Sequence, residues 1–252
     1  MKILFYAVLL FLAGTIFSQA ATRGDVKVIE ASENIRYLSQ KIVKDYLFLY
    51  KYPEQIEVKN KLNRELQLLS NDLRVIATTT KDSDTKDILE FLAYSKDQIS
   101  EIFDQKIDEE KVALMLDYSE TLLEGADSIA LAHKYEFSDE EKMLMTMKKI
   151  AYLLERVTKY YMALNIGFNT TTNKEQIQNA MTEIEESLYI VSQYSYPNEI
   201  QGTQHDINYA WQANRIFFDR SETLFIPKLI FISVSYLEDT VAKLELFHSK
   251  NQ

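Results

Sequence analysis

The sequence predicts an all-α protein from three observations: few residues that break helices, many that form them, and apolar residues spaced three or four apart. The 252 residues include 5 Gly and 3 Pro, where average usage would give about 18 and 13. Turn-rich β-sandwiches, β-barrels and Gly-loop nucleotide folds are therefore disfavoured. Long stretches are dominated by Leu, Glu, Lys, Ala and Gln, which have high helix propensity.

The first twenty residues have the pattern of a secretory signal peptide. Lys2 precedes an uncharged run that reaches Thr22, and Ser18 and Ala20 place small residues at positions −3 and −1 of a cleavage site. We therefore expect a signal peptide over residues 1–20 and an exported protein. The alternative is an uncleaved membrane anchor, because roughly 20 apolar residues can span a bilayer.

An internal duplication is predicted for the rest of the chain. With a shift of 115 positions, residues 28–137 align with residues 143–252 without a gap. Matched positions include Tyr37 with Tyr152, Tyr46 with Tyr161, Phe103 with Phe218, and His133 with His248. We expect two domains, residues 21–137 and 138–252, each an antiparallel four-helix bundle.

Each expected helix is marked by an apolar stripe. In the first half these stripes cover residues 28–49, 62–76, 92–102 and 115–129, and in the second half residues 177–191 repeat the second stripe. Stripes this narrow are typical of up-and-down bundles with coiled-coil-like packing. The predicted helices are roughly 20–28 residues long, or about 30–40 Å.

Turn and capping residues separate the expected helices. Pro53 is predicted at the first position of a helix, and Asp108 and Ser138 as N-caps, the latter in a capping box with Glu141. A second capping box is predicted over residues 172–175. The remaining turns are assigned to Pro197, Gly202 and Pro227.

The first expected helix carries a family resemblance. Residues 29–42, IEASENIRYLSQKI, resemble the opening helix of PilJ-type, or NarX-like, periplasmic sensor domains, whose pattern is I-N-x-A-G-x-x-R-M-L-S-Q-R-M. Five positions agree and two are similar, whereas Glu30, Ser32, Glu33 and Tyr37 depart from it. The agreeing positions are Ile29, Arg36, Leu38, Ser39 and Gln40, and the similar ones are Lys41 and Ile42. The resemblance covers residues 28–137 and, more weakly, 143–252.

The resemblance implies a periplasmic four-helix bundle that binds a small ligand. In nitrate-sensing members an Arg on the first helix grips the anion at a dimer interface, and Arg36 matches it. The candidate ligand-binding residues are Arg36, Ser39, Gln40 and Lys41, with Arg156 as the second-repeat equivalent of Lys41. The second repeat has Ala151, Leu154 and Glu155 where the first has Arg36, Ser39 and Gln40. The alternative for Arg36 is pairing along its own helix with Glu30 and Glu33.

Composition and motifs also narrow the function. The chain has no Cys, which excludes thiol nucleophiles and Cys-bound metals, and its net charge of −10 argues against non-specific nucleic-acid binding. Neither the Glu245-x-x-His248 spacing nor the acidic segment 82–87 meets the requirements of a metal site. We expect no catalytic set and no cofactor. The many carboxylates are predicted to lie on polar helix faces.

These observations lead to two functional hypotheses. The first is a non-enzymatic, periplasmic sensor-type protein that binds a small ligand, such as a small anion, and presents itself to a membrane receptor or another envelope protein. A homodimer is compatible with it. The alternative is a helical adaptor or structural protein of the envelope that binds no ligand.

Overall fold

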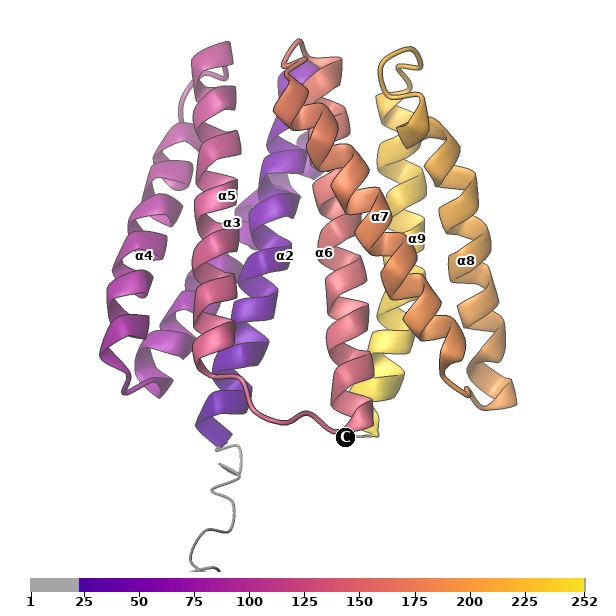
Figure 1. Ribbon diagram of the computed structural model, residues 1–252. Coiled ribbons are helices and arrows are strands. Elements are labelled where there is room, and N and C mark those ends of the chain that lie inside the picture. Colours follow the sequence, from indigo (N-terminus) through magenta and orange to yellow (C-terminus); the bar gives the residue numbers. More distant parts are fainter. Residues whose placement is uncertain (1–22, 252) are drawn as a thin grey trace, which may run out of the picture.

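The computed structural model describes residues 23–251, and the whole of that range is built from helices and short connections. The signal peptide predicted over residues 1–20 lies outside it. No helix in the described range is both long enough and apolar enough to cross a membrane. The prediction of an all-α protein is confirmed (Figure 1). The described range contains eight helices: α2 (Arg23–Lys51), α3 (Ile56–Thr79), α4 (Ser83–Phe103), α5 (Glu109–Ala132), α6 (Asp139–Asn165), α7 (Thr171–Gln193), α8 (Asn198–Asp219) and α9 (Pro227–Lys250).

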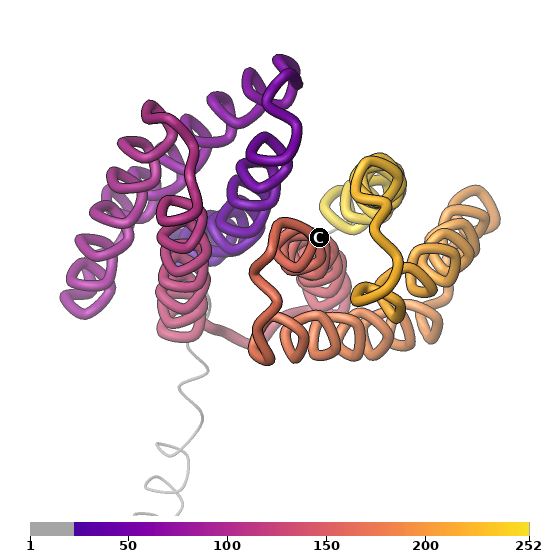
Figure 2. Tube along the Cα trace, turned by 90° about the horizontal axis from the view of Figure 1, so that it is seen from above, coloured from indigo at the N-terminus to yellow at the C-terminus, as the bar shows by residue number. Residues whose placement is uncertain are grey.

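The helices pack in a pattern that occurs twice along the chain. Helix α2 packs against α3 and α5, and α4 packs against α3 and α5. In the same order, α6 packs against α7 and α9, and α8 packs against α7 and α9. Figure 2 shows α2–α5 gathered on one side and α6–α9 on the other. Helices α2 and α6 lie in the middle and pack against each other.

Helices α2 and α6 run in the same direction, and their residues face one another in register. Three interactions join them: Lys148 Nζ donates to Asn34 Oδ1, Lys41 Nζ to Glu155 Oε1, and Lys51 Nζ to the carbonyl of Asn165. The partners are 114 residues apart in all three pairs. We call this parallel α2–α6 contact, marked by the three pairs, the seam. In Figure 1 both helices begin at the lower end of the molecule and end at the upper end.

The two central helices are buried on almost every side. Helix α2 buries 18 of its 29 residues, whereas α8 buries 4 of 22. The outer helices bury a stripe, as their apolar spacing predicts. On α2 the buried set extends to polar residues, including Ser39, Gln40, Lys44 and Asp45. Side chains that an outer helix would place in solvent are therefore enclosed between the two halves of the chain.

Several predicted helix starts are confirmed. Asp108 is the N-cap of α5 and accepts from the backbone N–H of Lys111. Ser138 and Glu141 form the predicted capping box at the start of α6. The acidic segment 82–87 contains the N-cap of α4, Asp82, which accepts from the N–H of Thr85. Each of these side chains satisfies a backbone donor that the first helical turn leaves free.

Three boundary predictions are wrong. Pro53 lies in the turn before α3, which begins at Ile56; the carbonyl of Tyr52 accepts from the N–H of Gln55, so Pro53 is the second residue of a β-turn. The predicted capping box at 172–175 is displaced, because Thr170 caps α7 and accepts from the N–H of Asn173. Gly202 lies inside α8 rather than in a turn.

Two glycines in the interiors of helices, Gly125 of α5 and Gly202 of α8, predict opposite effects on stability when a side chain is added. A Cβ at Gly125 would lie 2.4 Å from Leu92 Cδ2 on α4, whereas a Cβ at Gly202 meets no atom within 4 Å. Leu92 is buried and has little room to move. We expect Gly202→Ala to stabilise by up to about 1 kcal/mol through helix propensity. We expect Gly125→Ala to destabilise the protein, because overpacking against Leu92 costs about 1–3 kcal/mol and exceeds the gain in helix propensity.

Urea unfolding of both glycine variants measures this contrast. Equal stabilisation by the two substitutions would contradict the close approach of α4 and α5 at Gly125.

Candidate functional site

A cluster of buried charges lies at the centre of the seam. We define the seam cluster as Lys41, Lys44 and Asp45 of α2, Glu155 of α6 and Glu238 of α9; none of these side chains is more than 10% exposed. Lys41 pairs with Glu155, and its Nζ lies 3.2 Å from Glu238 Oε2. Lys44 Nζ lies 2.6 Å from Glu155 Oε2 and 3.2 Å from Asp45 Oδ1. The cluster thus joins three helices from both halves.

The two glutamates of the seam cluster differ in protonation. Burial opposes ionisation of Glu155, but Lys41 and Lys44 outweigh it and hold the pKa of this carboxyl below its usual range. Burial, reinforced by the neighbouring Glu155 carboxylate, raises the pKa of Glu238 well above its usual range. At neutral pH Glu155 is therefore ionised, and protonated Glu238 donates a hydrogen bond to it.

The buried charges continue onto α3. Lys61 Nζ lies 3.6 Å from Asp45 Oδ2 and 3.7 Å from Glu65 Oε1. The Glu65 side chain is 5% exposed, against 33% for Lys61. Burial and the adjacent Asp45 raise the pKa of Glu65 to about 8. Its carboxyl is therefore largely protonated at neutral pH.

A second buried group lies where α6 meets α5. Lys159 Nζ lies 2.5 Å from Glu120 Oε1 and 2.8 Å from Ser119 Oγ, and Arg156 donates to both Glu120 carboxylate oxygens. Burial opposes ionisation of Glu120, but Lys159 and Arg156 lower its pKa to about 2. Lys159 is fully buried with one anionic partner and a cationic neighbour, so burial lowers its pKa to about 8.

Arg36, the residue predicted to grip an anion, is held by internal partners. Its Nη1 donates to both Glu33 carboxylate oxygens at 2.9 and 3.0 Å, and its Nε lies 2.6 Å from Asp127 Oδ1. The guanidinium carbon lies 4.3 Å from the centroid of the Tyr152 ring on α6. Of the alternative prediction, pairing along the helix with Glu30 and Glu33, the contact with Glu33 is confirmed; the second carboxylate that Arg36 contacts is Asp127 of α5 rather than Glu30. Its ligand-binding role stays a prediction.

The other predicted site residues also lie beside the seam. Ser39 Oγ donates to the carbonyl of Arg36, and Gln40 Nε2 donates to Ser39 Oγ and to the carbonyl of Ser119. Lys41 belongs to the seam cluster, and Arg156 binds Glu120 and Gln176. The structure thus brings the predicted residues to one region, but pairs each charged head group with a carboxylate.

The prediction that carboxylates lie on polar helix faces is wrong for six of those in the described range. They are buried or nearly so, because α2 and α6 are enclosed on most sides and cover the inner faces of α3 and α9: Glu33, Asp45, Glu65, Asp72, Glu155 and Glu238. One signal was available: Lys44 and Asp45 interrupt the apolar run from Ile42 to Leu49. Two charges inside the longest apolar stretch of a half indicate buried ion pairs.

Two histidines occupy equivalent positions and have equivalent partners. His133 Nδ1 lies 2.9 Å from Asp25 Oδ1, and His248 Nδ1 lies 2.7 Å from Glu140 Oε2. Histidine and carboxylate are 108 residues apart in both pairs. Each pair ties the end of the last helix of a half to the start of its first helix. Glu245, three residues before His248, instead pairs with Lys148 at 3.1 Å.

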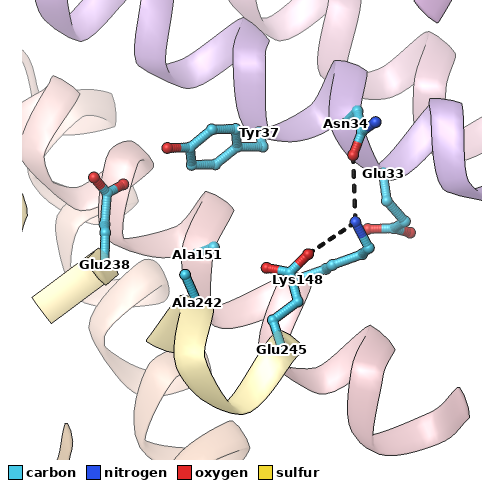
Figure 3. Close-up of a pocket in the computed structure, with 8 residues that line it drawn as sticks. All are labelled: Glu33, Asn34, Tyr37, Lys148, Ala151, Glu238, Ala242 and Glu245. Carbon is cyan, nitrogen blue, oxygen red and sulfur yellow. Dashed lines mark hydrogen bonds and ion pairs between the residues drawn. The ribbon is translucent and has the colours of Figure 1, made fainter. Parts of the chain in front are cut away.

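A pocket of about 230 Å³ opens beside the seam between α2, α6 and α9 (Figure 3). Lys148 Nζ bridges Asn34 and Glu245 at one end. At the other end the Tyr37 hydroxyl and the Glu238 carboxyl point toward one another. Glu238 Oε1 has no hydrogen-bond partner. The lining residues are Glu33, Asn34, Tyr37, Lys148, Ala151, Glu238, Ala242 and Glu245.

The raised pKa of Glu65 predicts a pH-dependent stability. Because the folded protein holds this proton up to about pH 8 and the unfolded chain releases it near its ordinary value of 4.5, the free energy of unfolding falls as pH rises between these values. Glu65→Gln mimics the protonated carboxyl, so we expect a shallower fall. Urea unfolding at pH 5 and pH 8 measures it, with exposed Glu57→Gln as the control. Equal slopes for the wild type and Glu65→Gln would contradict a buried, protonated Glu65.

The histidine contacts predict a large difference between two His→Ala variants. His248 is fully buried and bonded to Glu140 and Tyr196, whereas His205 is exposed on α8. We expect His248→Ala to cost about 2–4 kcal/mol, because it opens a cavity and removes two hydrogen bonds. His205→Ala should change stability by less than about 0.5 kcal/mol. Similar thermal unfolding of both variants would refute the His248 contacts.

Comparisons with known proteins identify no relative of this chain. No family model, no curated protein and no solved structure matches the chain. The resemblance to PilJ-type sensor domains therefore rests on the residues of α2 alone, and it stays a prediction.

Proposed function

We propose that this chain is an exported, non-enzymatic sensor-type protein built from two antiparallel four-helix bundles that arose by duplication. The two bundles, joined in one chain, pack against each other as the two subunits of a dimer would. The observation that carries the proposal is the parallel, in-register seam. In a symmetric dimer that pairs its first helices about a parallel two-fold axis, each residue faces its own copy. Here the facing residues are 114 apart, one less than the sequence offset of the two halves.

Two further features support the duplication. The packing order of α2–α5 recurs in α6–α9. The contact between a histidine and a carboxylate also occurs in both halves, as His133–Asp25 and His248–Glu140. The two histidines are 115 positions apart, and so are the two carboxylates. Neither a histidine nor its partner belongs to an apolar stripe, so similarity of helix pattern alone does not account for this match.

A ligand at the seam is the function that these features support best. The PilJ-type resemblance implies that an Arg of the first helix binds the ligand at a dimer interface, and the seam is the contact between α2 and α6, the first helices of the two halves. The pocket beside it is lined by residues of both halves. A ligand that touches both halves would alter their packing, which is how such a protein would present a changed surface to a receptor or another envelope protein.

The contacts of Arg36 favour the second candidate function, a helical adaptor or structural protein. A small anion at this guanidinium would have to displace Glu33 or Asp127, and each carboxylate left behind would lose a partner. An adaptor requires no such rearrangement, because its charges serve only to hold the halves together.

A thermal-shift screen distinguishes the two functions. Purified protein from the expressed full chain is heated with nitrate, nitrite, sulfate, amino acids and amines at constant ionic strength. For the sensor we expect at least one compound to raise Tm by about 3–5 °C at ten times its Kd. If the ligand is an anion held by Arg36, Arg36→Ala abolishes the shift and exposed Arg74→Ala does not. The absence of a shift with every compound would favour the adaptor.

A further inference from the structure

The two sides of the seam differ at a place where the duplication would make them equivalent. In the first half, Arg36 pairs with Asp127 and lies over the ring of Tyr152. With the offset of 115, the counterparts of these three residues are Ala151, Ala242 and Tyr37. The aromatic ring is retained, but alanine replaces both members of the ion pair.

The pocket lies where this ion pair is missing. Ala151, Ala242 and Tyr37 are all among its lining residues. Because alanine is much smaller than arginine or aspartate, the double replacement leaves unfilled space beside the seam. The pocket is thus the counterpart of a position that a guanidinium and a carboxylate fill in the other half.

The residues that line the pocket favour a cationic ligand over an anionic one. Three carboxyl groups line it: Glu33, Glu238 and Glu245. Its one cationic side chain, Lys148, pairs with Glu245 and donates to Asn34. Lys148 therefore adds no uncompensated positive charge, and an anion would meet more carboxyl oxygens than donors.

Glu238 is the group that points to a ligand. Its side chain is 10% exposed, and its Oε2 lies 3.2 Å from Lys41 Nζ. Its Oε1 is buried without a hydrogen-bond partner, and its carboxyl points into the pocket (Figure 3). A buried carboxyl oxygen without a donor is costly, and a ligand that donates a hydrogen bond would remove that cost.

We propose that this pocket binds the guanidinium or primary ammonium group of a small organic cation, in the place that corresponds to the Arg36 head group, with Glu238 accepting its hydrogen bond. The inference rests on the proposed function only in placing a ligand at the seam. At about 230 Å³ the pocket is smaller than sites for drug-sized ligands, so it suits a head group on a short chain. Because Lys41 already lies over the Tyr37 ring, the carboxyl groups rather than the ring determine affinity.

Agmatine, which carries one guanidinium and one ammonium group, is the probe. Isothermal titration calorimetry on the purified wild-type protein should detect binding at one site per chain. Glu238→Gln should weaken it at least tenfold, because a bound cation takes the place of the Glu238 proton and pairs with the carboxylate, whereas an amide cannot ionise. Glu199→Gln, which removes an exposed carboxylate from α8, should leave Kd unchanged.

A second variant fills the pocket instead of altering its charge. Ala151→Arg combined with Ala242→Asp restores the ion pair of the other half and should abolish agmatine binding, while far-UV circular dichroism and Tm confirm folding. Ala77→Arg, at an exposed position of α3, is the control for an added guanidinium. This test remains decisive even if Glu238→Gln folds poorly.

The outcomes separate this inference from the proposed function. Agmatine binding that Glu238→Gln weakens and the filled pocket abolishes supports both. Agmatine binding that neither variant changes overturns the pocket assignment. If agmatine does not bind but nitrate or another compound of the screen stabilises the protein, the cation inference fails and the sensor function stands. If nothing binds, both fail.

Discussion

The parallel contact between α2 and α6 is the constraint on which the rest of the structure depends. Each of these helices packs against two neighbours of its own half and against the other, so almost all of its surface is enclosed. The six outer helices then need only an apolar stripe. The fold is therefore organised around two largely buried helices, and the differences between the halves matter most where these helices meet.

Charges inside the seam determine how the two helices align. A buried ion pair contributes little net stability, since desolvation offsets attraction, but a buried charge without its partner costs about 3–5 kcal/mol. Lys41 and Lys44 share Glu155, and Lys51 reaches the last carbonyl of α6. A slide of one helical turn would separate these partners, whereas an apolar contact would tolerate it. The seam cluster thus selects the register that also leaves the pocket beside Ala151.

The sequence predicts the helices and their ends better than it predicts which side chains are buried between helices. Apolar stripes and capping residues such as Asp108 and Ser138 depend on neighbours in the chain, so they could be identified correctly. The burial of Glu155 and Glu65 depends on contacts between helices far apart in sequence, and polarity alone suggested exposure. Arg36 was identified from its motif, but its partner Asp127 lies 91 positions away on α5. The pocket depends on two alanines, and alanine in a helix is too common to indicate a site from sequence.

Cross-linking of cysteine pairs tests the parallel seam most directly, because the native chain has no Cys. Two double variants place cysteines at facing positions: Asn34→Cys with Lys148→Cys, and Lys51→Cys with Asn165→Cys. Two crossed variants pair position 34 with 165 and position 51 with 148, which are about 25 Å apart along parallel helices. A short bismaleimide should link both facing pairs within one chain and neither crossed pair. Linkage of the crossed pairs, with none of the facing pairs, would contradict the parallel packing of α2 and α6.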